Sequence, residues 1–152
     1  KELTLAQINQ NADIIYQVAS TAGLGVIDGA TEKDKFAIGV DSDQAAAFME
    51  TDKVKAEHIL TSALKRVDES LFRAIQLEQE GKLTWGAKEV LGISEGCVGI
   101  AKNDIYKANV SAETVTMIDE LEKGILDGSV VVDTAFGKST DEIQAIKSSV
   151  RP

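Results

Sequence analysis

Small and hydroxyl-bearing residues follow the first apolar run of the chain, in residues 19–25, which read ASTAGLG. Small residues let a ligand approach the backbone, and the hydroxyl groups of Ser20 and Thr21 can donate or accept hydrogen bonds. We therefore take Ala19, Ser20, Thr21 and Gly23 as candidate ligand contacts. Capping of the helix that follows would explain the same hydroxyl groups equally well.

Two carboxylates and one ammonium group stand where two further apolar runs end. Asp41 and Asp43 follow the run Phe36–Val40, and Lys65 follows the run Ile59–Ala63. Carboxylates accept hydrogen bonds from sugar hydroxyls or an amine, and a lysine donates to ligand oxygens or to those carboxylates. These residues are the candidate polar contacts of a small-molecule site. An Asx-turn or helix cap would also account for the aspartates, and surface solvation for the lysine.

The periodicity of the chain predicts elements that bring these segments to one edge of a sheet. Strands are expected over 13–19, 36–40 and 59–63, and helices over 24–32 and 66–80. A strand, helix, strand unit makes a right-handed crossover between parallel strands. Ligands of such sheets bind beyond the carboxyl ends of the strands. The expected fold class is therefore α/β, a parallel-sheet layered fold.

Further patterns continue this alternation toward the C-terminus. We expect short strands over 88–92 and 97–100, a helix capped by Ser111 and ended by Gly128, a strand over 130–132 and a helix over 140–148. The first ten residues predict a helix that stops near Asn11. All 152 residues are expected to form a single α/β domain.

The composition excludes several classes of function. A formal net charge of −9 and one small basic cluster argue against binding to nucleic acid or an anionic membrane. The single cysteine, Cys97, allows no internal disulfide, and its apolar neighbours favour a packing role. The single histidine, His58, favours a surface or strand-edge role over catalysis, and Trp85 is expected to pack at an edge. We expect no cofactor, no metal and no catalysis.

One enzyme class remains as an alternative. Gly23-Leu24-Gly25 after a strand, with Asp41 ending the next strand, is similar to the dinucleotide-binding fingerprint. The third glycine is displaced, because Asp28 stands where it belongs and Gly29 comes one residue later. That glycine lets the helix pack closely on the strand. An NAD-type enzyme domain is therefore the alternative hypothesis.

Five ordered blocks of the sequence resemble the basic membrane protein family, whose members are substrate-binding lipoproteins of ABC transporters. The blocks are Asn11–Ala19, Gly23–Gly25, Ala37–Gln44, Ile59–Asp68 and Leu91–Gly99. Two departures stand out: the segment Ala45–His58 is longer than the family pattern, and Cys97 replaces a glycine. The first could alter the rim of the pocket.

The resemblance implies a type I periplasmic-binding-protein fold with two lobes, of which this chain is the C-terminal, ligand-binding lobe. It also implies a purine nucleoside or similar hydroxylated solute as ligand, a permease as partner, and a lipid anchor outside the cytoplasmic membrane. The loop with Asp41 and Asp43, together with Lys65, would contact ribose hydroxyls, and residues 19–25 would line the cleft beside the base. The N-terminal lobe and the anchoring cysteine would lie upstream of Lys1. A ligand-sensing regulatory domain of the same fold is a further alternative.

Overall fold

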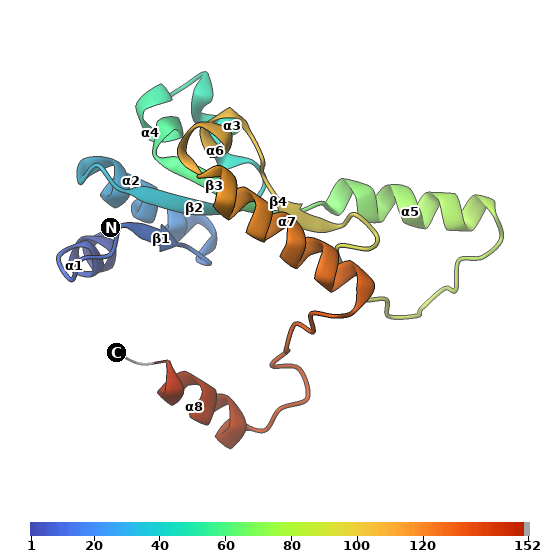
Figure 1. The fold of residues 1–152 in the computed structure, drawn as a ribbon. Coiled ribbons are helices and arrows are strands. Elements are labelled where there is room, and N and C mark those ends of the chain that lie inside the picture. The colour runs from blue at the N-terminus through green and yellow to red at the C-terminus, as the bar shows by residue number, and fades with distance from the viewer. Residues whose placement is uncertain (151–152) are drawn as a thin grey trace. The chain divides into compact units, whose positions relative to one another are not determined.

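Four strands form one sheet, in the order β1-β2-β3-β4, in the computed structural model, which describes residues 1–150. The strands are β1 (Ile14–Tyr16), β2 (Phe36–Asp41), β3 (Ile59–Lys65) and β4 (Val98–Ile100). The first three run parallel, and β4 runs antiparallel to β3 (Figure 1). The chain divides into two compact units: Lys1–Thr116 contains the whole sheet, and the second unit begins at Met117. The predicted α/β fold is confirmed, and its sheet is parallel except for β4.

Buried apolar residues set the register of the parallel strands. Ile15 of β1 pairs with Ala37 of β2, which pairs with Ile59 of β3, and all three side chains are buried. The next pair along β2 and β3 is Ile38 with Thr61, so Leu60 is an extra residue in a bulge. Strands that alternate buried and less buried residues in this way present one face to a helical layer.

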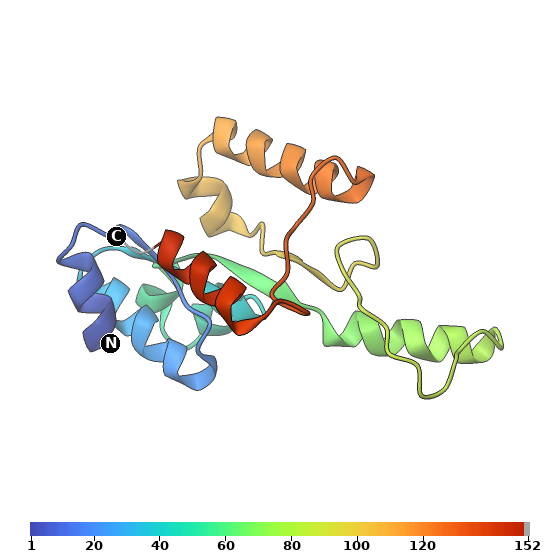
Figure 2. The same ribbon diagram turned by 90° about the horizontal axis from the view of Figure 1, so that it is seen from below.

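Short helices before and between the parallel strands form that layer. They are α1 (Glu2–Ile8), the 3-10 helix η1 (Ser20–Gly23), α2 (Leu24–Glu32), α3 (Gln44–Met49) and α4 (Lys53–Glu57). α2 packs on β1 and β2, α3 packs on β2 and β3, and α4 contacts both β3 and α2. α1 lies beside α2 (Figure 2).

The hydrophobic core lies between this layer and the sheet. Its buried members are Ile27, Ala30, Ala37, Ala45 and Ile59, with Val26, Phe48 and Ile105 packed against them. Ile27 and Ile59 are fully buried, and burial of each such side chain stabilises the fold by about 1.5–3 kcal/mol. The core therefore ties α2, α3, β2 and β3 together, and the ends of β2 and β3 carry Asp41 and Lys65.

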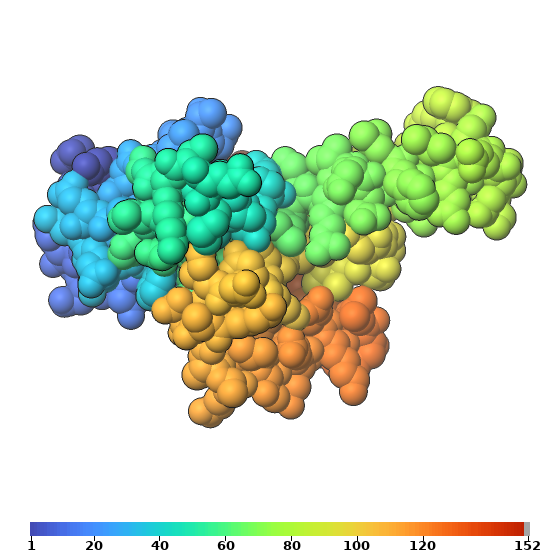
Figure 3. Space-filling view, turned by 90° about the horizontal axis from the view of Figure 1, so that it is seen from above, coloured from blue at the N-terminus to red at the C-terminus, as the bar shows by residue number. Residues whose placement is uncertain are grey.

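Three further helices follow the parallel strands: α5 (Val67–Gln79), α6 (Asp104–Asn109) and α7 (Ala112–Asp127). α6 packs against β3, and Asn103 caps it by accepting a hydrogen bond from the Tyr106 N–H at 3.0 Å. α5 leads away from the sheet and has no buried residue (Figures 1 and 3). Its residues match the predicted helix over 66–80.

The second unit contains the end of α7 and the helix α8 (Thr140–Ser149). Gly128 ends α7 with φ at +80°, a left-handed conformation that glycine adopts without strain. Ser139 and Glu142 form a capping box at the start of α8. None of the helices described in residues 1–150 is long and apolar enough to cross a membrane.

Several predictions about elements were wrong. Residues 88–92 and 130–132 form no strand, and Trp85 is exposed instead of packed at an edge. The strand predicted over 13–19 ends early, at Tyr16, and β4 starts at Val98. The helices α3, α4 and α6 were not predicted, because five or six residues are too few to show a helical period.

Candidate functional site

A pocket of about 290 Å³ opens at the carboxyl ends of β1, β2 and β3, the edge at which the sequence predicts a site. Its lining residues are Tyr16, Val18, Ala19, Ser20, Val40, Asp41, Ala63, Leu64 and Lys65. They come from the ends of three neighbouring strands and from the loop after β1. Parallel strands end on the same side of a sheet, so this edge gathers chain segments that lie far apart in the sequence.

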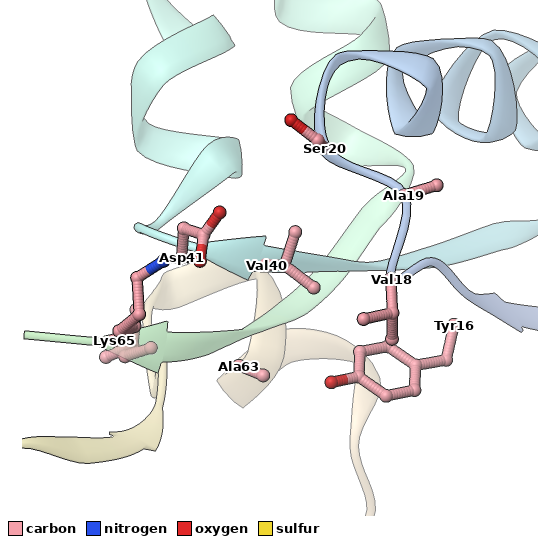
Figure 4. Close-up of a pocket in the computed structure, with 9 residues that line it drawn as sticks. Tyr16, Val18, Ala19, Ser20, Val40, Asp41, Ala63 and Lys65 are labelled. Carbon is pink, nitrogen blue, oxygen red and sulfur yellow. Dashed lines mark ion pairs between the residues drawn. The ribbon is translucent and has the colours of Figure 1, made fainter.

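An ion pair forms the polar end of the pocket. The Lys65 Nζ atom lies 2.8 Å from the Asp41 Oδ1 atom, and both side chains are more than half exposed (Figure 4). Asp41 has φ at +69°, a left-handed conformation that aspartate tolerates better than most residues. An exposed pair of this kind contributes little to stability. Its donor and acceptor groups therefore remain available to hydrogen-bond a ligand at small energetic cost.

An apolar surface forms the other end. The side chains of Tyr16 and Val18 lie together there (Figure 4), and they are 54% and 78% exposed. Val40, Ala63 and Leu64 continue the apolar lining. Exposed aromatic and branched side chains gain free energy when a flat apolar group covers them. The pocket thus suits a ligand with a hydroxyl-bearing part at Asp41 and Lys65 and an apolar, flat part over Tyr16.

The pocket brings together four of the seven predicted site residues: Ala19, Ser20, Asp41 and Lys65. The other three, Thr21, Gly23 and Asp43, are not among its lining residues. Thr21 is exposed within η1, and Gly23 is buried at its end. The role of all seven residues as ligand contacts stays a prediction.

Asp43 has structural partners that explain its position. Its carboxylate accepts a hydrogen bond from the Ala46 N–H at 3.2 Å and caps α3. The same carboxylate accepts from the Asn103 side-chain amide, with both oxygens 3.0 Å from Nδ2. Asn103 caps α6, so Asp43 joins the starts of two helices. The helix-cap alternative for Asp43 therefore matches these contacts.

Sequence reasoning did not single out five of the lining residues: Tyr16, Val18, Val40, Ala63 and Leu64. Each lies within or just after an apolar run, and such residues are read as core. All five lie at or just after the carboxyl end of a strand, and that position in the predicted sheet is the signal that could have identified them. Val40 pairs with Ala63, and Asp41 pairs with Leu64.

The glycines of the dinucleotide-like pattern are explained by close packing. A Cβ atom on Gly23 would lie 2.0 Å from the Gln17 Oε1 atom, and one on Gly25 would lie 2.8 Å from the backbone nitrogen of Lys1. Asp28, at the displaced third position, pairs with Lys55 of α4 at 2.8 Å. These contacts fill the space beside the glycines with protein atoms, whereas a pyrophosphate needs that space open.

His58 and Cys97 make structural contacts. Among residues 1–150, no group of three or more His, Cys, Asp or Glu side chains is placed to hold a metal ion. The His58 Nδ1 atom lies 2.9 Å from the Lys35 carbonyl oxygen, and the ring packs near Phe36. Cys97 is buried, and its thiol donates to the Glu95 carbonyl at 3.7 Å.

Comparison with known families gives a match to the family described as ABC transporter substrate-binding protein PnrA-like, or Bmp, over residues 1–135. The chain belongs to this family. It is 31% identical to Basic membrane protein D of Borreliella burgdorferi over 123 residues, which cover 79% of this chain and 34% of that protein. It is 26% identical to the CD4+ T-cell-stimulating antigen of Listeria monocytogenes over 141 residues, 87% of this chain and 39% of that protein.

Solved structures extend the comparison of this Bmp family chain. A solute-binding protein of an ABC transporter system from Aeropyrum pernix matches with a TM-score of 0.76 and 20% identity, over 97% of this chain and 47% of that one. A transcriptional activator of the comK gene from Bacillus halodurans matches with a TM-score of 0.72 and 21% identity, over 87% and 43%. At such identities the likeness shows the fold alone. The chain spans about a third to two fifths of the curated relatives and under half of these structures.

Proposed function

We propose that this chain is the ligand-binding lobe of the solute-binding component of an ABC transporter, and that the solute is a nucleoside with a purine base. Family membership supports the transporter component. The observation that supports the ligand class is the exposed Asp41–Lys65 pair beside the apolar surface of Tyr16 and Val18. A nucleoside combines vicinal hydroxyl groups with a flat base, and these two ends match the two ends of the pocket.

The proposed binding mode needs no chemical step. The Asp41 carboxylate accepts hydrogen bonds from ribose hydroxyls, and the Lys65 ammonium donates to a ribose oxygen. The base lies over Tyr16 and Val18, with Ala19 and Ser20 at its edge. A ribonucleoside provides hydroxyl groups that hydrogen-bond Asp41 and Lys65. A deoxy analogue lacks one of these hydroxyl groups and leaves a polar side chain without a partner, so it binds more weakly.

Partners and location follow from the same proposal. A second lobe, encoded upstream of Lys1, covers the open side of the pocket, and a permease receives the solute. The full-length protein is held by a lipid outside the cytoplasmic membrane. Because a clamped ligand draws contacts from both lobes, residues 1–152 alone bind a nucleoside more weakly than micromolar.

The test is calorimetric and thermal-shift titration of the full-length protein, upstream segment included, against purine and pyrimidine nucleosides, sugars and NAD. Asp41→Asn removes the charge while asparagine tolerates the left-handed backbone, and Lys65→Met removes the ammonium. Lys82→Met, at another exposed lysine, is the matched control. We expect stabilisation by a purine nucleoside that the first two variants weaken at least ~10-fold and the control leaves unchanged.

Two other outcomes would replace the proposal. Stabilisation by NAD alone would favour the dinucleotide-dependent enzyme. Nucleoside binding by a full-length protein whose upstream segment is a DNA-reading module would favour a ligand-sensing regulator. The matched comK activator structure shows that this fold also occurs in a transcriptional activator.

A further inference from the structure

Two glutamine side chains connect the backbone of two residues that line the pocket on different sides, Val40 and Ala19. The Gln44 Oε1 atom accepts a hydrogen bond from the Val40 N–H at 3.0 Å and another from the Gln17 Nε2 atom at 3.0 Å. The Gln17 Oε1 atom accepts from the Ala19 N–H at 3.1 Å. Gln17 is only 2% exposed, so its amide must find partners within the protein. The chain of contacts runs from Val40 through both side chains to Ala19.

The Val40 and Ala19 N–H groups, at the two ends of this series of hydrogen bonds, each precede a pocket residue with a strained backbone. Val40 precedes Asp41, which has φ at +69°, and Ala19 precedes Ser20, which has φ at +50°. Left-handed backbone at residues other than glycine persists only where the surrounding structure holds it. A hydrogen bond to the N–H of the preceding residue supplies such a constraint on each wall.

Gly23 and Gly39 show that the two glutamine side chains are closely packed. A Cβ atom on Gly23 would lie 2.0 Å from the Gln17 Oε1 atom. A Cβ atom on Gly39 would lie 2.5 Å from the Gln44 Oε1 atom. The backbone N–H of Gln44 also donates to the Ser62 Oγ atom of β3 at 3.2 Å. Hydrogen bonds to three elements therefore hold Gln44: β2 and the loop after β1 hold its side chain, and β3 holds its backbone.

We infer that Gln17 and Gln44 are positioning residues that lock the Ala19–Ser20 wall to the Val40–Asp41 wall and so fix the width of the pocket. The inference rests on the proposed function for its effect on affinity, but the lock itself is a property of the contacts. Gln44 acts through its oxygen, which receives two N–H groups. A glutamate at position 44 keeps that acceptor, whereas a methionine of similar length removes it.

The experiment compares Gln44→Met, Gln44→Glu and Gln76→Met in the full-length protein. The last is a matched control on an exposed position of α5. Nucleoside affinity is measured by calorimetry, and hydrogen exchange is measured at the Val40 and Ala19 amides. We expect Gln44→Met to weaken nucleoside binding at least ~10-fold and to speed exchange at both amides. Gln44→Glu should stay within ~3-fold of wild type in affinity, because the acceptor is retained.

The decisive measurement is hydrogen exchange at the Ala19 amide in Gln44→Met, because Gln44 is connected to Ala19 through the Gln17 side chain. Faster exchange at Val40 alone would mean that Gln44 only holds its own strand, and the inference would be overturned. Equal loss of affinity in Gln44→Met and Gln44→Glu would also overturn it, since that is the mark of a general packing role.

Failure of the proposed function would be visible separately. If the wild-type protein binds no nucleoside, the ligand proposal fails. Hydrogen exchange at the Val40 and Ala19 amides then tests on its own whether the glutamines connect the two walls. Protection at both amides in wild type and Gln44→Glu, with loss at both in Gln44→Met, would support it. Unchanged exchange in all variants would exclude it.

Discussion

Asp41 and Asp43 stand two residues apart, yet their contacts give them different tasks. Asp43 caps α3 and accepts from the Asn103 amide, whereas Asp41 pairs with Lys65 at the rim of the pocket. Asp43→Ala should lower the free energy of unfolding by about 1–2 kcal/mol, because it removes a helix cap and a hydrogen bond between two helix starts. Asp41→Asn should change it by less than about 0.5 kcal/mol.

Urea denaturation of the two variants, followed by circular dichroism, measures this contrast. Nucleoside affinity of the full-length variants should show the reverse order, with Asp41→Asn the more affected. A larger loss of stability in Asp41→Asn than in Asp43→Ala would contradict the assignment of roles.

Gly23 offers a second residue-scale test, because its place beside Gln17 leaves no room for a side chain. The methyl group of Gly23→Ala would overlap the buried Gln17 amide, and overpacking of this kind costs about 1–3 kcal/mol. Gly99→Ala is the control, since a Cβ atom on Gly99 meets nothing within 4 Å. The midpoint of thermal unfolding should fall in Gly23→Ala and stay near wild type in Gly99→Ala. Equal midpoints would show that Gln17 moves aside freely.

These residues also show how far a sequence can define the site. The apolar runs predicted the three parallel strands but not the end of the first one, which stops at Tyr16. Ala19, Ser20, Asp41 and Lys65 were expected at one edge of the sheet and lie there. The sequence could not separate Asp41 from Asp43, because the partner that distinguishes them, Asn103, comes 60 residues later. A long-range hydrogen bond of this kind leaves no local pattern.

At the scale of elements, the predictions succeeded for helices with a clear amphipathic period. They failed for strands that were predicted only from β-branched residues. The helices over 24–32, 66–80 and 140–148 match α2, α5 and α8. The valine-rich segments 88–92 and 130–132 form no strand, and Val90 and Val131 are 86% and 87% exposed. β-branched residues favour a strand only where a neighbouring strand pairs with them, and no sequence window shows that neighbour.

The start of α8 carries a pH-dependent element. The Ser139 hydroxyl and backbone N–H, both 2.7 Å from the Glu142 Oε2 atom, hold the pKa of that carboxyl below the usual range of a glutamate. A lowered pKa in the folded state means that the stabilisation is complete above the ordinary glutamate pKa and is lost as pH falls through the lowered one. The first turn of α8 should therefore fray on acidification.

NMR chemical shifts of residues 140–143, followed from pH 7 to pH 3, measure that fraying. Glu142→Gln keeps the capping geometry without a titrating group, so its shifts should depend less on pH than those of wild type. Identical pH profiles in the two proteins would show that the capping box does not control this turn. The effect should be detectable, because a ten-residue helix is marginal without its cap.

At the scale of the whole molecule, α5 presents an apolar stripe that is more than half exposed. Val67, Leu71 and Ile75 recur at four-residue spacing and are 51%, 61% and 59% exposed. Positions four apart lie on one face of a helix, so the three side chains form a continuous strip. We expect the isolated chain to self-associate through this strip, because association removes its apolar surface from water.

Sedimentation velocity over a range of concentrations tests this association. Ile75→Lys places a charge in the strip and should leave the chain monomeric, whereas Gln76→Lys adds the same charge on the opposite side of α5 and should behave like wild type. Identical behaviour of both variants would assign any association to another surface, and a monomeric wild type would show that the strip alone is too small to hold two copies. The same two substitutions test whether the upstream lobe proposed above covers the strip. If it does, Ile75→Lys should lower the thermal stability of the full-length protein and Gln76→Lys should not.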